Sequence, residues 1–207
     1  MTPEEEKGRR RFLKDSVAAS AAALGLGASG APGAEKKTSG TQSIPAARDM
    51  PTGKIGDLEV SRLISGGNLL GGWSHSRDLS YVGQLMRHYN TEEKILDTLE
   101  LAEQNGVNTI IAYIHGETPI AGSNQQKSIM DKYWDERGGS MQWIAQSTAS
   151  VNNLTYDIDW AIDHGASAVY MNGALAERWI DEGRIDLLGK CVDHIKEQGV
   201  PAGFGAH

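Results

Sequence analysis

Polar side chains of the kinds that bind ligands or transfer protons stand directly after several short apolar runs of this chain. They are Asn68, His115, Glu117, Gln146, Asn172 and His207. A histidine near a carboxylate, as at His115 and Glu117, can serve as acid and base. With His207, the same pair could hold a divalent metal that keeps one position for water, although no His-x-x-x-His motif is present. Each residue, taken alone, could also be polar only because it meets solvent.

Residues 69–89 form a long stretch after the first of these apolar runs, with a short helix expected from about Leu79. Loops longer than about 12–15 residues within a compact domain usually have a function. Trp73 and Arg77 in this stretch are therefore expected to cover the mouth of a ligand site and to contact a substrate. A packed surface loop is the alternative. His75 is not expected to take part.

The first apolar run ends in Gly66-Gly67-Asn68. The glycine spacing matches neither the G-x-G-x-x-G of dinucleotide sites nor the sequence of a phosphate loop, which ends in Lys-Ser/Thr. No helix is expected directly after it. We therefore expect the glycines to leave room for a group that enters the site, and Asn68 to supply hydrogen bonds.

The elements that position these residues follow a repeat of helix, glycine and strand. Glycines 106, 138, 165 and 199 each end a helical pattern and precede an apolar run, at a spacing of roughly 30 residues that is typical of βα units. A capping box at Asn90–Glu93 begins the first helix. The expected strands are 61–66, 107–114, 141–146, 168–171 and 201–205, and the later expected helices are 124–136, 153–163 and 185–197.

This order predicts an α/β fold with a parallel sheet. We expect residues 53–207 to form the N-terminal part of a (β/α)8 TIM-type barrel, with about five of its eight βα units. The alternative is a complete, doubly wound domain of five strands, which normally ends with a helix over its last strand; no helical pattern follows 201–205. In a barrel, the carboxyl ends of the strands surround the active site and would bring the polar residues together.

Composition narrows the classes of function. The chain has 207 residues, enough for one domain with a hydrophobic core, and a net charge of -7, so no overall positive field attracts nucleic acid. Cys191 is the single cysteine, which rules out an intramolecular disulfide and a cysteine metal cluster. No apolar run reaches the ~20 residues of a membrane span. A small-molecule ligand is the expected partner.

Residues 1–34 have the order of an export signal, with basic, then apolar, then small side chains. The segment Arg9-Arg10-Arg11-Phe12-Leu13-Lys14 resembles the bacterial twin-arginine (Tat) signal, Arg-Arg-x-Phe-Leu-Lys. The resemblance implies that the Tat export machinery is a partner and that the folded protein is periplasmic or extracellular. Residues 35–52, rich in small and polar side chains, are expected to form a flexible linker.

Two segments resemble the aldo/keto reductase superfamily. Leu58–Gly67 looks like that family's opening segment, Val-Ser-Arg-Leu-x-x-Gly, and Glu103–Ile110 looks like its Gly-Ile-Asn segment at the second strand. The chain is more similar still to uncharacterised Tat-exported bacterial proteins of that type, which share Gly66-Gly67-Asn68, Tyr133-Trp134 and Trp143–Gln146. The resemblance implies a (β/α)8 barrel of reductase ancestry.

The reductases use a tetrad of Asp, Tyr, Lys and His, and the corresponding positions of this chain hold none of the four. They hold Ile111, His115, Gln146-Ser147 and Asn172. The resemblance therefore implies the fold without the tyrosine–lysine mechanism. The cofactor stays unknown. Nicotinamide and a divalent metal both remain open, and the sequence contains a motif for neither.

Three functions remain open. The first is an oxidoreductase-like enzyme on a small carbonyl or sugar-like substrate, with His115 as acid/base, Glu117 as its partner, and Asn68 and Asn172 as substrate positioners. The second is a metal-dependent isomerase or lyase on the same barrel. The third is a non-catalytic periplasmic binding barrel. The further substrate-binding candidates are Trp73, Arg77, Gln146 and His207.

Overall fold

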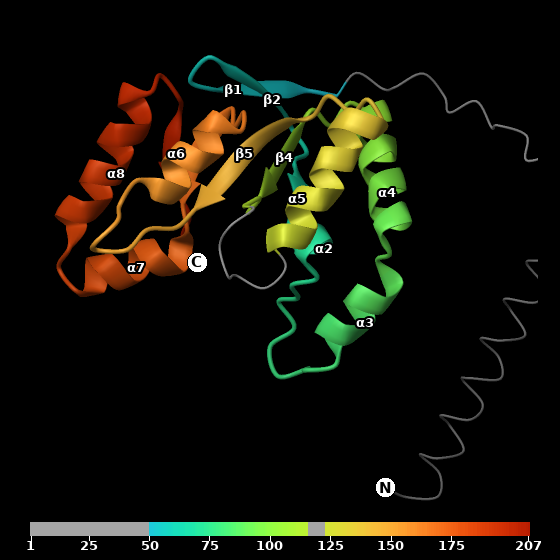
Figure 1. The fold of residues 1–207 in the computed structure, drawn as a ribbon, viewed down its shortest axis with the longest axis horizontal. Helices are drawn as coiled ribbons and strands as arrows, with labels where there is room; N and C mark the ends of the chain where they lie inside the picture. The colour runs from blue at the N-terminus through green and yellow to red at the C-terminus, as the bar shows by residue number, and fades with distance from the viewer. Residues whose placement is uncertain (1–49, 116–122) are drawn as a thin grey trace, which may run out of the picture. The chain divides into compact units, whose positions relative to one another are not determined.

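Five parallel strands form the central sheet of the computed structural model, which describes residues 50–115 and 123–207 (Figure 1). The strands are β3 (Ser65–Gly66), β4 (Thr109–Ala112), β5 (Gln142–Ser147), β6 (Ala168–Met171) and β7 (Ala202–Phe204). They are hydrogen-bonded in sequential order from β3 to β7. The predicted α/β class with a parallel sheet is confirmed. The doubly wound alternative is wrong. In such a fold the first strand lies inside the sheet, whereas here the first strand of the sheet, β3, lies at its edge.

The first strand is shorter than expected. Of the predicted run 61–66, only Ser65–Gly66 joins the parallel sheet. The residues before it form an antiparallel hairpin, in which β1 (Thr52–Ile55) pairs with β2 (Leu58–Ser61). The predicted signal, 1–34, and nearly all of the predicted linker lie outside the described residues.

Asn108 ties this hairpin to the sheet. Its Oδ1 accepts a hydrogen bond from the Ser61 backbone nitrogen at 2.8 Å, and its Nδ2 donates to the Glu59 carbonyl at 3.1 Å. The same carbonyl accepts a hydrogen bond from Gln142, the first residue of β5. The hairpin therefore lies at the amino ends of β4 and β5. The candidate site lies at the opposite, carboxyl ends of the strands.

In the sequence, the helical segments of the described ranges come between consecutive strands of the sheet. They are α2 (Asn68–Gly71), α3 (Val82–Tyr89), α4 (Glu92–Gln104), α5 (Ser123–Asp131), the π-helix η1 (Lys132–Glu136), α6 (Tyr156–Asp163), α7 (Gly173–Asp181) and α8 (Ile185–Glu197). None of them is long and apolar enough to cross a membrane. The four glycines predicted to end helices all have positive φ, which glycine adopts without steric cost. Helix α7 was not predicted.

The cap of α4 lies one residue later than predicted. Thr91, and not Asn90, is the N-cap, and its hydroxyl accepts a hydrogen bond from the Lys94 backbone nitrogen at 3.5 Å. Glu92 and Glu93 then occupy the first turn, where carboxylates are stabilised by the helix dipole. The shift leaves the helix face unchanged, so Ile95 and Leu99 are buried as expected.

One hydrophobic core lies between the helices and one face of the sheet. Alternate strand residues enter it, namely Ile110, Ala112, Trp143, Ala145, Val169 and Met171. The residues between them point to the opposite face, because successive side chains of a strand alternate. There Ile111, Ile144, Ala168 and Tyr170 line a mostly apolar recess of about 360 Å³. The helices therefore cover one face of the sheet.

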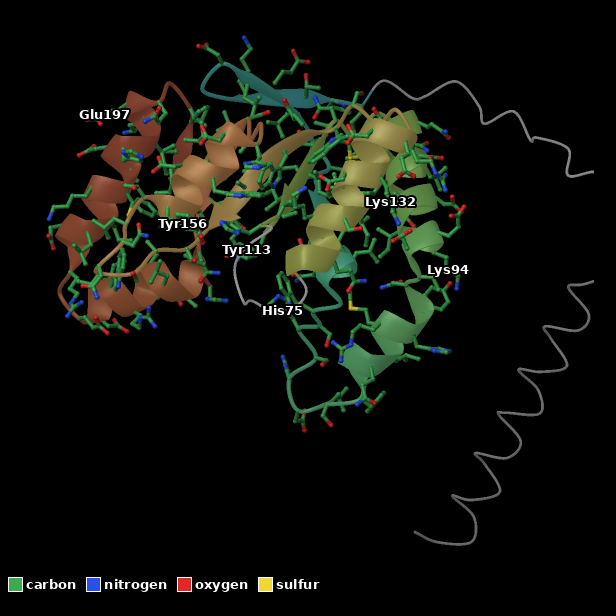
Figure 2. All side chains as sticks on the ribbon, viewed as in Figure 1. His75, Lys94, Tyr113, Lys132, Tyr156 and Glu197 are labelled. Carbon is green, nitrogen blue, oxygen red and sulfur yellow. The ribbon has the colours of Figure 1, made fainter. Side chains whose placement is uncertain are left out.

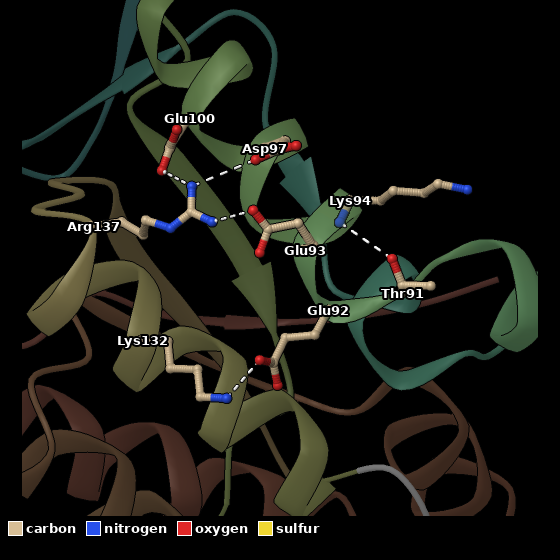
Figure 3. A network of polar contacts seen from close by, with 8 residues as sticks. All are labelled: Thr91, Glu92, Glu93, Lys94, Asp97, Glu100, Lys132 and Arg137. Atoms are coloured by element: carbon tan, nitrogen blue, oxygen red, sulfur yellow. Dashed lines mark hydrogen bonds and ion pairs between the residues drawn. The ribbon is translucent and has the colours of Figure 1, made fainter.

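A polar network joins α4 to η1 on the outer surface, where Figure 2 labels Lys94 and Lys132 and Figure 3 shows the contacts. The Arg137 guanidinium donates to Glu100 and to Glu93, each at 2.8 Å. These hydrogen bonds raise the pKa of Arg137. Exposed ion pairs of this kind add little stability one by one, so the network mainly orients the end of η1.

A second polar cluster, partly buried, also ties α4 to η1. Tyr133 donates a hydrogen bond to Glu103, whose other carboxylate oxygen accepts from the Ser140 backbone nitrogen at 2.9 Å. Burial alone would raise the pKa of Glu103, but the hydrogen bonds from Ser140 and Tyr133 outweigh it and lower that pKa. Burial and the bond to Glu103 raise the pKa of Tyr133. The pair is therefore a carboxylate and a neutral phenol at neutral pH.

Candidate functional site

An open cleft of about 580 Å³ lies at the carboxyl ends of the strands. Each strand of the sheet contributes to its wall. The contributions are Gly66–Asn68 at the end of β3, Ile111–Tyr113 at the end of β4, Gln146 of β5, Tyr170 and Asn172-Gly173 around the end of β6, and Gly205–His207 after β7. The parallel topology thus brings together residues that are far apart in the sequence.

Five of the six predicted substrate-binding residues line this cleft, namely Asn68, Trp73, Gln146, Asn172 and His207. The sixth, Arg77, is exposed, does not line it, and has a left-handed backbone with φ of 54°. His75, which was not expected to take part, does line the cleft. Tyr113 and Tyr170 were not singled out from the sequence and also lie in its wall.

Gln146 and Tyr170 form a connected pair in the cleft wall. They are register partners on β5 and β6, and the Tyr170 hydroxyl donates a hydrogen bond to Gln146 Oε1 at 2.8 Å. Burial raises the pKa of Tyr170, so its phenol is neutral at neutral pH. The bond fixes the orientation of the Gln146 amide and gives the wall one defined polar face.

Asn172 has a structural task as well as a place in the cleft. It is the N-cap of α7, and its Oδ1 accepts a hydrogen bond from the Leu175 backbone nitrogen at 3.1 Å. Its own backbone nitrogen donates to the Ser147 carbonyl at 2.8 Å, which fixes it to the end of β5. The predicted substrate positioner is therefore held rigidly at the rim.

His207 pairs with Glu177 of α7. Its Nδ1 lies 3.0 Å from Glu177 Oε2, and its backbone nitrogen donates to Glu177 Oε1 at 2.6 Å. The hydrogen bonds from the His207 backbone and ring lower the pKa of Glu177. Both side chains are exposed, so this pair stands at the solvent side of the cleft.

The two glycines of the first strand end have different roles. A Cβ on Gly67 would lie 2.8 Å from Ala112 Cα and 2.9 Å from the Ile111 carbonyl, so this residue allows close contact with β4. A Cβ on Gly66 would meet nothing within 4 Å, and only this glycine leaves room in the cleft as expected. Contrary to prediction, helix α2 begins directly after them.

His115, the predicted acid/base, is buried and does not line the cleft. Its ring stacks on Trp160 of α6 with centroids 4.4 Å apart, and its Nε2 lies 3.2 Å from Asp157 Oδ1. The predicted partner, Glu117, lies outside the described residues. The carboxylate that the structure places beside His115 is therefore Asp157, which the sequence interpretation missed.

Asp157 lies in the first turn of α6, where the helix dipole favours a carboxylate. It is 8% exposed. Its Oδ2 accepts hydrogen bonds from the Tyr113 hydroxyl at 3.1 Å and from the Thr148 hydroxyl at 2.6 Å. Asp157 therefore stands behind the cleft wall, connected to it through Tyr113.

The described residues that line the cleft include no Lys, Arg, Asp or Glu. Their polar side chains are the amides of Asn68, Gln146 and Asn172, the phenols of Tyr113 and Tyr170, the imidazoles of His75 and His207, the Ser65 hydroxyl and the Trp73 indole. Among residues 50–115 and 123–207, no three His, Cys, Asp or Glu side chains come together in an arrangement that could hold a metal.

We compared the chain with models of protein families, with curated proteins and with solved structures, and none of the three comparisons found a match.

Proposed function

We propose that the cleft binds a small, neutral carbonyl or sugar-like compound, and that the protein acts on it by acid–base chemistry as an enzyme of reductase-like ancestry. The observation that carries the proposal is the lining within residues 50–115 and 123–207, which is polar and aromatic but contains no Lys, Arg, Asp or Glu. A phosphate or carboxylate ligand would normally be met by arginine or lysine side chains.

The chemistry of the lining matches a polyhydroxylated ligand. Each amide offers both a donor and an acceptor, as a sugar hydroxyl does, and Asn68, Gln146 and Asn172 come from three different elements around the cleft. The rings of Trp73 and Tyr170 supply apolar surface for carbon–hydrogen groups. The phenol of Tyr113 and the imidazole of His75 add groups with exchangeable protons, which favours an enzyme over a binding protein.

The finer fold assignment is part of this proposal: the five strands are the first five of a (β/α)8 barrel. A (β/α)8 barrel has the same sequential strand order and carries its helices on one face of the sheet. The reason is that right-handed crossovers in one direction along the sheet place every helix on the same face. The apolar recess beside Ile111 and Ile144 supports the assignment, because a barrel fills its interior with such side chains. Phe204 of β7, 53% exposed, lies at the edge where a sixth strand would pair.

The barrel assignment is tested by an experimental structure of the protein as its gene encodes it. We expect a sixth parallel strand hydrogen-bonded to β7 and inward side chains filling the recess. A structure in which β7 is the edge of the sheet and the recess is open to solvent would contradict the barrel.

Ligand class is tested by calorimetric titration with D-glucose, D-xylose and D-glyceraldehyde, and with D-glucose 6-phosphate as the anionic counterpart. We expect at least one neutral compound to bind, and the phosphate to bind at least about tenfold more weakly than D-glucose, because no Lys or Arg in the described part of the chain lines the cleft to offset its desolvation. Tighter binding of the phosphate, or no binding by any of the neutral compounds, would contradict the proposal.

Two variants act as a matched pair for this titration. Asn68→Ala removes a cleft amide and should weaken binding about three- to tenfold, the usual worth of one hydrogen bond. Arg77→Ala removes an exposed side chain outside the cleft and should leave the affinity unchanged. Equal effects of the two substitutions would place the ligand elsewhere.

A further inference from the structure

A buried carboxylate stands directly behind the wall of the cleft. Asp157 is 8% exposed, and its Oδ2 accepts hydrogen bonds from the Tyr113 hydroxyl, the Thr148 hydroxyl and the Thr148 backbone nitrogen, at 3.1, 2.6 and 3.3 Å. Its Oδ1 faces His115 Nε2 at 3.2 Å. Burying a carboxylate is unfavourable unless such partners surround it, so four contacts on one side chain mark a built arrangement.

Tyr113 connects this carboxylate to the cleft. It follows β4 and lies near the start of α6, where Tyr156 lies (Figure 2). Of Tyr113, His115 and Asp157, Tyr113 is the one that lines the cleft. A phenol placed between a ligand site and a carboxylate can exchange protons with both, because its oxygen is a donor and an acceptor.

We propose that Tyr113 and Asp157 form a proton relay that opens into the cleft. The O–H bond of a ligand hydroxyl breaks and its proton bonds to the Tyr113 oxygen, while the phenolic proton of Tyr113 moves to Asp157 Oδ2. The electron pair stays on the ligand oxygen, and Asp157 becomes a neutral carboxylic acid. The reverse transfer returns both protons. Only the identity of the ligand in this relay depends on the proposed function.

His115 has a positioning role in this relay. Its Nε2 lies 3.2 Å from Asp157 Oδ1, the carboxylate oxygen that Tyr113 does not use, so it contacts the carboxylate from the far side. The stacking of its ring on Trp160 fixes its orientation. The predicted acid/base histidine thus acts on the cleft through Asp157 and Tyr113.

Other titratable groups near Asp157 have contacts of their own. On α6 itself, Asp159 pairs with His194 of α8 at 2.5 Å, and His164 Nδ1 lies 2.7 Å from the Trp160 carbonyl. The segment after β4 contributes Tyr113 and His115, and the segment after β5 contributes Thr148, which does not titrate. A shift of the Tyr113 titration can therefore be assigned to Asp157 by substitution.

The relay is tested in the ligand-free, full-length protein by nuclear magnetic resonance of labelled tyrosines, of which the chain has 6. Tyr113→Phe identifies the Tyr113 signal. We expect Asp157→Asn to lower the pH midpoint of Tyr113 ionisation by at least about one unit, a tenfold change in its ionisation constant, because the carboxylate that holds the phenol neutral is gone. Tyr170, which bonds to Gln146, should keep its midpoint. An unchanged Tyr113 midpoint would overturn the relay.

A second variant covers the case in which Asp157→Asn fails to fold. Asp157→Ser also removes the carboxylate, so the Tyr113 midpoint should again fall, and an unchanged midpoint would overturn the relay. Neither titration needs a ligand, so failure of the sugar titrations and failure of the relay are distinguishable.

Discussion

Trp179→Ala is expected to lower the free energy of unfolding by about 3–5 kcal/mol, the range for removing a large aromatic side chain from a core. Trp179 is 2% exposed and packs in the main core from α7. Helix α7 carries Glu177, the partner of His207, and its N-cap, Asn172, lines the cleft. Urea unfolding followed by circular dichroism measures the loss.

The neighbouring residue supplies the control. Ile180 lies on the same helix but is 52% exposed, so Ile180→Ala should change the stability by no more than about 0.5 kcal/mol. Similar losses for both variants would mean that α7 does not pack through its Trp179 face, and would remove the support for the cleft rim at Asn172.

Gly67→Ala should cost about 1–3 kcal/mol of stability, as overpacking does. The backbone of Gly67 has φ of -73° and ψ of -12°, which alanine adopts easily, so the cost is steric. The new Cβ would lie 2.8 Å from the Ala112 Cα, and a backbone atom of the central sheet cannot move away as a flexible side chain would. Thermal and urea unfolding both report this loss.

Gly66→Ala is the matched substitution one residue earlier. Its Cβ would meet nothing within 4 Å, so stability should be unchanged or raised by up to about 1 kcal/mol, since alanine restricts the unfolded chain. Because Gly66 lines the cleft, the same substitution should weaken ligand binding. A larger stability loss at Gly66 than at Gly67 would contradict the contact of Gly67 with β4.

The repeat of helix, glycine and strand was predictable from the sequence because local chemistry controls it. Gly106 and Gly165 both take the positive φ that ends a helix, and β6 has the predicted bounds. Helix α7 was missed because its two turns follow a strand directly, where a loop was expected. The predicted strand 61–66 was divided because Ser61 bonds to Asn108, a contact across 47 residues that no local pattern shows.

The cleft residues that could be predicted are those at strand ends, because parallel topology alone brings Asn68, Gln146 and Asn172 to one rim. Asp157 could not be found in this way. It lies on a helix, and its hydrogen bond to Tyr113 spans 44 residues and depends on how α6 packs against β5 and β6. The one available signal was its place in the first turn of a helix, which many acidic residues share.

A crystal structure of the protein with the tightest-binding neutral compound of the titration series tests the central claim most directly. The account predicts that this compound lies in the cleft, in contact with the amides of Asn68, Gln146 and Asn172. A compound bound at another surface, with the cleft at the carboxyl ends of β3–β7 unoccupied, would contradict it.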